Sequence, residues 1–229
     1  MSDFSIERRL WGKGYKLIAG VDEVGRGPLA GHLITAAVVF PVGSRKLETA
    51  ELERNLAGVD DSKKLTASRR IECMRRIKHL ALDWSISGVS PAEIDRIGIG
   101  KAIAKAHAGA IFRLKVIPDY ILVDGKRALT AGDFDNIGEH SGQYANIKST
   151  SIIKGDSISL SIAAASIIAK VTRDRMLTFA ARQLPDYGFE HHKGYGTAEH
   201  LRQLKSLGPT NIHRFSFAPL KNEELRLDE

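Results

Sequence analysis

Cysteine is almost absent from this chain of 229 residues. Cys73 is the one cysteine, so the chain cannot form an internal disulfide or a zinc site built from cysteines. A protein with so little cysteine suits a reducing compartment, and we expect it in the cytoplasm. Cys73 lies in a basic stretch with a helical pattern, and we expect it to pack in the interior.

Long hydrophobic runs are also missing. The longest weakly polar stretch, residues 160–169, is interrupted by two serines and is too short to cross a bilayer. The first nine residues lack the apolar core of a signal peptide, and their acidic residues argue against an organellar transit peptide. The sequence has no internal repeat and no low-complexity segment. We therefore expect a soluble protein with no membrane partner.

What the chain does have is the composition of a folded globular protein with a basic balance. Hydrophobic residues make up 43% and charged residues 27%, which excludes a disordered chain. Lysine and arginine total 34 against 27 aspartates and glutamates, which gives a net charge of +7. This excess favours a polyanionic partner.

The hydrophobic periodicity predicts an α/β fold with a mixed sheet and helices packed on it. The first two strands should form an antiparallel hairpin, and Ser90-Pro91-Ala92-Glu93 is a helix capping box. We expect one catalytic domain over residues 1–190 and a small helical extension, 191–229, packed on the same domain. The expected strands are 15–24, 32–40, 84–89, 120–123 and 146–153, and the expected helices are 2–11, 67–81, 99–115, 157–183 and 198–206.

Two adjacent acids end the first apolar run. Asp22 and Glu23 would be costly to bury unless they are solvated, paired or bound to a metal, and Mg²⁺ or Mn²⁺ is the natural partner of carboxylate oxygens. Neighbouring side chains on a regular strand point to opposite faces, so both acids can serve one site only where the strand bends or ends. Gly25 and Gly27 permit such a bend, and Arg26 adds a positive charge. The alternative is a polar strand end followed by a hairpin turn.

Three further acids occupy suggestive positions. Asp124 ends an apolar strand, which is where open α/β sheets place ligands, although it could be a simple turn residue. Asp156 precedes the longest helical pattern and could cap that helix. Asp174 lies further along the same helix between arginines, where a surface ion pair would explain it.

One segment has a specific resemblance. Residues 20–31, GVDEVGRGPLAG, resemble the signature of the ribonuclease HII family, type 2 ribonuclease H. The resemblance spans residues 18–217 and implies an RNase H-like fold, a central mixed sheet flanked by helices. The further blocks that resemble the family, in the same order, are 61–65, 123–125, 154–156, 164–175, 192–197 and 213–217.

The resemblance also implies a reaction. It implies an endoribonuclease that hydrolyses the RNA strand of RNA–DNA hybrids and cuts 5′ to single ribonucleotides in duplex DNA, leaving 5′-phosphate and 3′-hydroxyl ends. We expect two divalent ions, Mg²⁺ or Mn²⁺, with Asp22 shared between them, and a monomeric enzyme. The implied catalytic carboxylates are Asp22, Glu23, Asp124 and Asp156, with Asp174 as a further metal ligand.

Substrate recognition is assigned by the same resemblance. The backbone of Gly25, Arg26 and Gly27, together with Tyr195, would read the 2′-hydroxyl at the RNA–DNA junction. The family often carries proline or alanine where this chain has Gly196, so the pose of that loop is open. Candidate phosphate contacts, each of which could equally be a solvated surface charge, are Lys63, Lys64, Lys193 and Arg214.

Two other functions stay open. The chain could cut long RNA–DNA hybrids and not single embedded ribonucleotides, or it could bind hybrid duplexes without cutting them, although the complete acid set opposes the second. A metal site built from His191, His192 and His213 is disfavoured, because histidine prefers softer ions than magnesium and the spacing is not that of a helical pair of ligands.

Overall fold

The protein forms a five-stranded mixed sheet with helices on both faces. The computed structural model describes residues 2–41, 49–135, 137–139, 141–144 and 146–222. The strand order is β3-β2-β1-β4-β5, with β1 antiparallel to β2, β2 antiparallel to β3, and β1, β4 and β5 parallel. The predicted hairpin and mixed sheet are therefore confirmed. The strands are β1 (Ile18–Val24), β2 (Leu33–Val39), β3 (Asp83–Val89), β4 (Tyr120–Asp124) and β5 (Lys148–Ile152).

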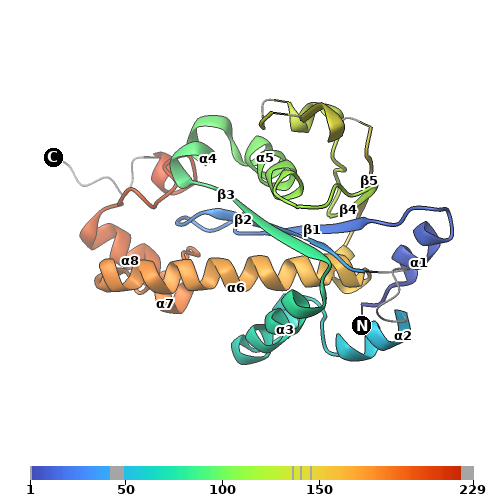
Figure 1. The fold of residues 1–229 in the computed structure, drawn as a ribbon. Coiled ribbons are helices and arrows are strands. Elements are labelled where there is room, and N and C mark those ends of the chain that lie inside the picture. The colour runs from blue at the N-terminus through green and yellow to red at the C-terminus, as the bar shows by residue number, and fades with distance from the viewer. Residues whose placement is uncertain (1, 42–48, 136, 140, 145, 223–229) are drawn as a thin grey trace.

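Helices form a layer on each side of the sheet. Figure 1 shows α5 across one face and the long α6 across the other, with α3 packed beside α6. The capping box is confirmed at α4, where the Ser90 hydroxyl accepts a hydrogen bond from the Glu93 amide. The helices are α1 (Ser5–Trp11), α2 (Thr49–Asn55), α3 (Ala67–Leu80), α4 (Pro91–Ile97), α5 (Ile99–Phe112), α6 (Leu160–Gln183), α7 (Phe189–His192) and α8 (Ala198–Leu207).

Two hydrophobic cores sandwich the sheet. On the α6 face, small and branched residues of the helix, including Ala163, Ala164 and Ile167, pack against Ile34, Ala36 and Val38 of β2 and against α3. Cys73 belongs to this core and is fully buried, as predicted. The α5 face is covered by a separate cluster that includes Ile111, Ile121 and Val123. The central strands β1 and β2 are buried on both faces, so the acids on β1 extend from a rigid platform.

The start of α6 differs from the prediction. The helix begins at Leu160 and not at 157, because Ser159 is its cap and accepts a hydrogen bond from the Ile162 amide. Residues 155–157 form a separate 3₁₀ turn that contains Asp156. Asp156 therefore does not cap α6, and that interpretation is wrong. The short helices α2 and α7 were not predicted, while α1, α5 and β5 are shorter than expected.

The C-terminal segment packs on the end of α6. Leu204 of α8 and Leu220 form one apolar cluster with Leu29 and Leu177, so this segment contacts both the glycine-rich loop and the long helix. Residues 223–229 of the predicted extension lie outside the described residues. None of the helices described is long and apolar enough to cross a membrane.

Candidate active site at the carboxyl ends of β1 and β4

The parallel pairing of β1 and β4 brings the first acids together. Val21 is the register partner of Val123, so Asp22 of β1 and Asp124 at the end of β4 follow neighbouring positions at one edge of the sheet. A carboxyl end of adjacent parallel strands is the place where α/β sheets form their sites. The sequence prediction that these two acids share a site is consistent with this register.

Asp22 is the most buried of the acids. Its residue is 5% exposed, and its Oδ1 accepts a hydrogen bond of 2.7 Å from the Glu23 amide. Burial raises the pKa of Asp22 well above its usual value, and three neighbouring carboxylates, on Glu23, Asp124 and Asp156, raise it further. A hydrogen bond from Ser166 of α6 opposes that rise. Asp22 therefore sits at the centre of the negative charge, between the other acids.

Glu23 points to the opposite face of the sheet. Its side chain is 5% exposed, and its Oε2 lies 2.8 Å from Nε2 of His107 on α5. Its Oε1 makes a longer ion pair of 3.4 Å with Arg26. The alternation of side chains along β1 thus persists at this position, and the two adjacent acids leave the strand on opposite sides. The Glu23 carboxylate is still close enough to raise the pKa of Asp22, and it lines the same hollow as Asp124. His107 was not singled out from the sequence, where a lone polar residue among the alanines of α5 was the available signal.

Asp124 and Asp156 are joined through the turn after β5. Oδ1 of Asp124 accepts a hydrogen bond of 2.7 Å from the Gly155 amide, the residue before Asp156. Asp156 is 5% exposed, and its Oδ2 lies 3.6 Å from Nζ of Lys63. Burial raises the pKa of Asp156, the carboxylates of Asp61 and Asp124 raise it further, and Lys63 opposes them. Asp61 is thus another acid of this site that the sequence analysis did not assign.

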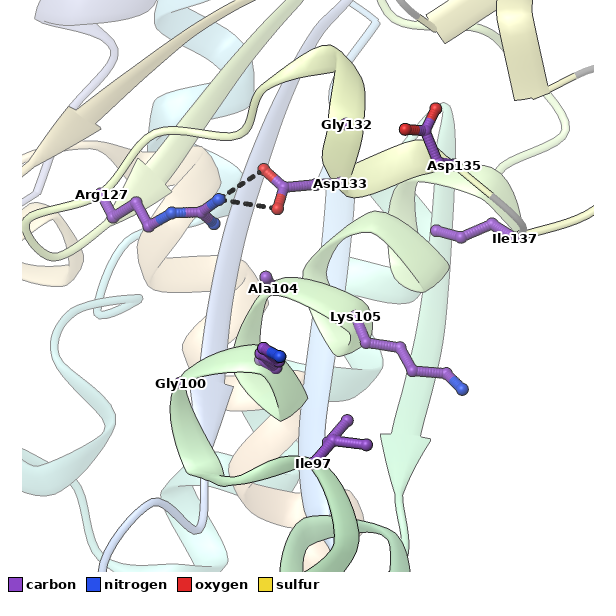
Figure 2. A pocket seen from close by; sticks show the side chains of 10 residues that line it. Ile97, Gly100, Ala104, Lys105, Arg127, Gly132, Asp133, Asp135 and Ile137 are labelled. Atoms are coloured by element: carbon purple, nitrogen blue, oxygen red, sulfur yellow. Dashed lines mark hydrogen bonds and ion pairs between the residues drawn. The ribbon is translucent and has the colours of Figure 1, made fainter.

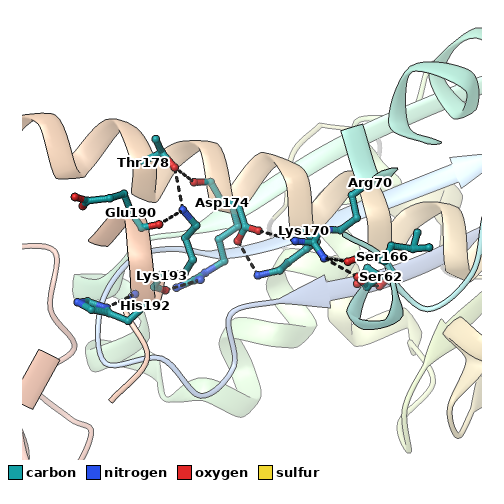
Figure 3. A network of polar contacts seen from close by, with 12 residues as sticks. Ser62, Arg70, Ser166, Lys170, Asp174, Thr178, Glu190, His192 and Lys193 are labelled. Carbon is teal, nitrogen blue, oxygen red and sulfur yellow. Dashed lines mark hydrogen bonds and ion pairs between the residues drawn. The ribbon is translucent and has the colours of Figure 1, made fainter. Parts of the chain in front are cut away.

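Asp174 is not brought to these acids. It lies two turns beyond Ser166 on α6, where Lys170 donates a hydrogen bond of 2.7 Å to its Oδ1 and Arg70 lies 3.7 Å from its Oδ2 (Figure 3). It is also missing from the charges that raise the pKa of Asp22. In this structure Asp174 forms an ion pair between α6 and α3, and its assignment as a metal ligand stays a prediction.

The chemistry of the remaining acids fits a divalent metal. Their donors are all carboxylate oxygens, and their mutual repulsion raises pKa values that a bound cation would lower again. Among the residues that the structure describes, no group of three or more histidine, cysteine or acidic side chains is arranged so that it could hold a metal ion. Two of the acids are instead held by cations or donors of the protein, Glu23 by His107 and Arg26, and Asp156 by Lys63.

A hollow of about 440 Å³ opens beside the acids. It is lined by Glu23, Asp124, His107 and the basic side chains of Lys126 and Arg127, among others. A second hollow of about 630 Å³ continues from it over α5, since both share Gly100, Ala104 and Arg127. Figure 2 shows Arg127 in this second hollow, with its guanidinium directed at the carboxylate of Asp133.

The glycine-rich loop between β1 and β2 is held by two buried arginines. Arg173 donates to the carbonyls of Ala30 at 2.8 Å and His32 at 3.0 Å, and Arg214 donates to those of Gly31 and Arg26. Both arginines are 0% exposed. Arg214 therefore cannot reach a phosphate at the surface, and the predicted phosphate contact is replaced by a structural role. Its burial lowers its pKa to about 10.

Tyr195 lies beside the same loop. The Gly194 carbonyl accepts a hydrogen bond of 2.8 Å from the Leu29 amide, which ties the tyrosine segment to the loop. Tyr195 is 43% exposed, so its ring is available to a ligand. The Arg173 guanidinium lies 5.9 Å from that ring and also donates to the Lys193 carbonyl, so one arginine contacts both segments.

The three lysines predicted to contact phosphate differ in their surroundings. Lys63 has an 81% exposed side chain next to Asp156, and Lys64 pairs with Asp60 at 3.4 Å. Lys193 is half-buried, and its Nζ donates to the Glu190 carbonyl and to the Thr178 hydroxyl (Figure 3). Lys63 therefore lies nearest to the acids.

Two of the histidines predicted not to bind metal, His192 and His213, lie in a buried cluster with His200. Nε2 of His200 lies 3.1 Å from Nε2 of His213, and the ring of His192 stacks on His200. Burial lowers the pKa of both His200 and His213 to about 4. His200 and His213 are therefore neutral near pH 7, and their contact joins α8 to the segment that follows it. His191 is exposed at the surface.

Comparison with known proteins identifies relatives of this chain. Two curated proteins named ribonuclease HII are each 43% identical to this chain over 94% of its length. One, from Geobacter metallireducens, is covered over 93% of its length, and the other, from Halalkalibacterium halodurans, over 72%. The crystal structure of ribonuclease H2 from Pyrococcus horikoshii superposes with a TM-score of 0.72 and 28% identity, covering 91% of this chain and 97% of that one.

The match extends through the site and the packing around it. The profile of the ribonuclease HII family matches residues 19–220, from the first acidic strand to the last segment of the C-terminal cluster. The expected fold is confirmed by the structural likeness. The chain belongs to the ribonuclease HII family, and it is a hydrolytic endonuclease of the ribonuclease H type, which acts on the RNA strand of RNA–DNA hybrids.

Proposed function

We propose that this protein cuts RNA–DNA hybrids by two-metal catalysis, and that it also cuts 5′ to a single ribonucleotide embedded in duplex DNA. The observation that supports this most directly is the hydrogen bond between Leu29 and Gly194. It places Tyr195 beside a glycine-rich loop that leaves the acidic strand β1 only a few residues earlier. The acids proposed to cut and the residues proposed to recognise the substrate are thus joined through one loop.

Each acid would have its own role in binding the two ions. Asp22 would bind both ions, since the charges of Glu23, Asp124 and Asp156 all act on it. Asp124 and Asp156 would each hold one side, and Glu23, which lines the hollow beside Asp124, would close the set. When bound, a pair of divalent ions supplies the polarisation that activates a water and stabilises charge on the leaving 3′ oxygen. The Gly155 amide keeps Asp124 oriented for this task. The products would be a 5′-phosphate and a 3′-hydroxyl.

Ribonucleotide recognition requires a close approach to the backbone of the loop. Gly27 has no positive φ angle, and a methyl group added to it would meet nothing within 4 Å. Neither backbone conformation nor packing within the protein therefore accounts for a glycine here. A bound sugar that passes close to the loop would account for it, and its 2′-hydroxyl is what separates RNA from DNA. Tyr195 would pack on the neighbouring sugar.

One comparison of substrates tests the proposal. Purified protein is supplied with Mg²⁺ or Mn²⁺ and three duplexes: DNA with one ribonucleotide, a full RNA–DNA hybrid, and plain DNA. We expect cleavage 5′ to the lone ribonucleotide and within the hybrid, and none in plain DNA. Cleavage of the hybrid alone would favour an enzyme for long hybrids. Binding without cleavage of any duplex would overturn the catalytic proposal.

A further inference from the structure

His107 is the one described histidine in contact with a carboxylate of the proposed metal site. It lies on α5, which packs on the face of the sheet opposite α6. Its residue is 4% exposed, and its neighbours in the helix, Ala106, Ala108 and Gly109, are small and buried. An imidazole at such a position needs a polar partner, since burial of an unpaired polar group is costly. Glu23 is that partner.

The contact is short and defined at both atoms. Nε2 of His107 lies 2.8 Å from Oε2 of Glu23, and each side chain is 5% exposed. An ionised carboxylate only accepts hydrogen bonds, so the imidazole carries a hydrogen on Nε2 and donates it. The second oxygen of Glu23 is held less firmly, because Arg26 is 3.4 Å away and its side chain is 65% exposed. The direction of the carboxylate is therefore set mainly by His107.

We propose that His107 is a positioning residue for Glu23 and that its Nε2–H donor sets the affinity of the acidic site for divalent ions. The inference rests on the proposed function, in which Glu23 belongs to the metal site. With one oxygen of Glu23 fixed by α5, the carboxylate stays at the wall of the hollow it shares with Asp124. Without the donor, Glu23 would be held only by its longer ion pair with the exposed guanidinium of Arg26.

The physical basis is the effect of residues that do not bind the metal themselves but hydrogen-bond to its ligands. Hydrogen bonds to a ligating carboxylate fix its orientation, and their loss typically weakens metal binding or activity about 10–100-fold. A donor is needed, and bulk alone is not enough. Leucine at position 107 would fill the space without a donor, whereas glutamine would offer an amide N–H on a side chain of similar reach.

The test compares His107→Leu with His107→Gln. Mn²⁺ binding is measured without nucleic acid, from the loss of the free-ion signal in electron paramagnetic resonance, and thermal unfolding is followed in parallel. We expect His107→Leu to raise the Mn²⁺ dissociation constant about 10–100-fold and His107→Gln to stay within about threefold of the wild type. His79→Leu, at an exposed histidine of α3, is the matched control and should bind Mn²⁺ as the wild type does.

Two results would overturn the proposal. One is equal Mn²⁺ affinity in the Leu and Gln variants and the wild type, and the other is an equal loss in both variants, which would mean that only packing matters. Neither depends on which duplex the enzyme cuts. If the wild type binds Mn²⁺ and fails to cut at a ribonucleotide, the proposed specificity fails while the role of His107 stands.

Discussion

Gly20 of β1 lies directly against Ser161 of α6. A methyl group on Gly20 would overlap the backbone of Ser161 and of Ile162, so the strand and the helix touch without a side chain between them. Asp22 is two residues further along β1 and therefore faces the same helix. The close approach of α6 thus sets the depth at which Asp22 is buried, and with it the raised pKa of that carboxyl.

Gly20→Ala should therefore damage both stability and the site. The added methyl group meets backbone atoms that cannot move aside, so we expect the free energy of unfolding to fall by about 3 kcal/mol or more. Urea unfolding followed by circular dichroism measures this. Gly100→Ala, at an exposed helical glycine with nothing within 4 Å, is the control and should gain about 0.4–1 kcal/mol. Equal stability of the two variants would contradict this account.

Asp124→Asn tests the metal site. The substitution keeps the size of the side chain and an acceptor for the Gly155 amide, and it removes one negative charge from the acid cluster. Loss of a residue that only hydrogen-bonds to a metal ligand typically costs roughly 10–100-fold in metal affinity or activity. Asp124 is itself a proposed ligand, so we expect cleavage to fall by more than that, while hybrid binding is retained. Single-turnover cleavage and a filter-binding assay measure the two quantities. Asp186→Asn, at an exposed aspartate, should leave both unchanged, and wild-type cleavage by Asp124→Asn in saturating Mg²⁺ would refute the assignment.

Much of the fold follows from local patterns. The apolar runs at β1 and β4 predict buried strands, and the caps Thr66 and Ser90 lie where the sequence places helix starts. The start of α6 does not follow from its own sequence. There Glu7 of α1 accepts hydrogen bonds from the Ser159 hydroxyl and the Ser161 amide, so a partner about 150 residues away completes the first turn. A pattern read along the chain cannot show such a contact.

The candidate site residues that could be predicted from the sequence are the acids at the ends of apolar strands. Asp22 and Asp124 stand at the ends of apolar strands, and such ends are where sheets bind ligands. Residue type alone misplaced Arg214 and could not show the ion pair of Asp174 with Arg70, because an arginine or aspartate looks the same in sequence whether it is buried, paired or free. His107 was missed for the same reason, since its partner is 84 residues away.

Gly27→Ala and Gly25→Ala separate recognition from folding. At Gly27 the protein leaves room for a methyl group, so we expect stability within about 0.5 kcal/mol of the wild type. Cleavage at a lone ribonucleotide should still fall on the order of 100-fold, because the sugar is displaced from the loop. Differential scanning calorimetry and cleavage assays test this pair of effects. Unchanged cleavage by Gly27→Ala would contradict the proposed role of the loop.

Gly25→Ala is the contrasting variant. Its φ of +102° disfavours a side chain, and the added carbon would lie 2.5 Å from Nε of Arg173. We therefore expect a loss of about 1–3 kcal/mol in stability together with the loss of cleavage. If Gly25→Ala were as stable as the wild type, the arginine frame behind the loop would be less rigid than the contacts imply.

The buried histidine pair predicts how stability depends on pH. His200 and His213 have a pKa of about 4 in the folded chain against 6.5 ordinarily. Between pH 4 and pH 6.5 these two histidines bind more protons in the unfolded chain than in the folded chain. Their contribution to the free energy of unfolding is therefore complete above pH 6.5 and falls as the pH is lowered. By pH 5 we expect a loss of about 2 kcal/mol for each histidine, measured by urea unfolding.

The histidine pair can be isolated by substitution, because other titrating groups contribute equally to both proteins. His213→Gln removes one of the two protonation sites, so its stability should fall less steeply between pH 7 and pH 5 than that of the wild type. His191→Gln, at an exposed histidine, should follow the wild-type curve. If the stability of His213→Gln fell between pH 7 and pH 5 as steeply as that of the wild type, the lowered pKa of His213 would not contribute to the acid sensitivity. The expected result would instead tie acid sensitivity to the segment that holds Tyr195, whose carbonyl lies 3.0 Å from Nδ1 of His200.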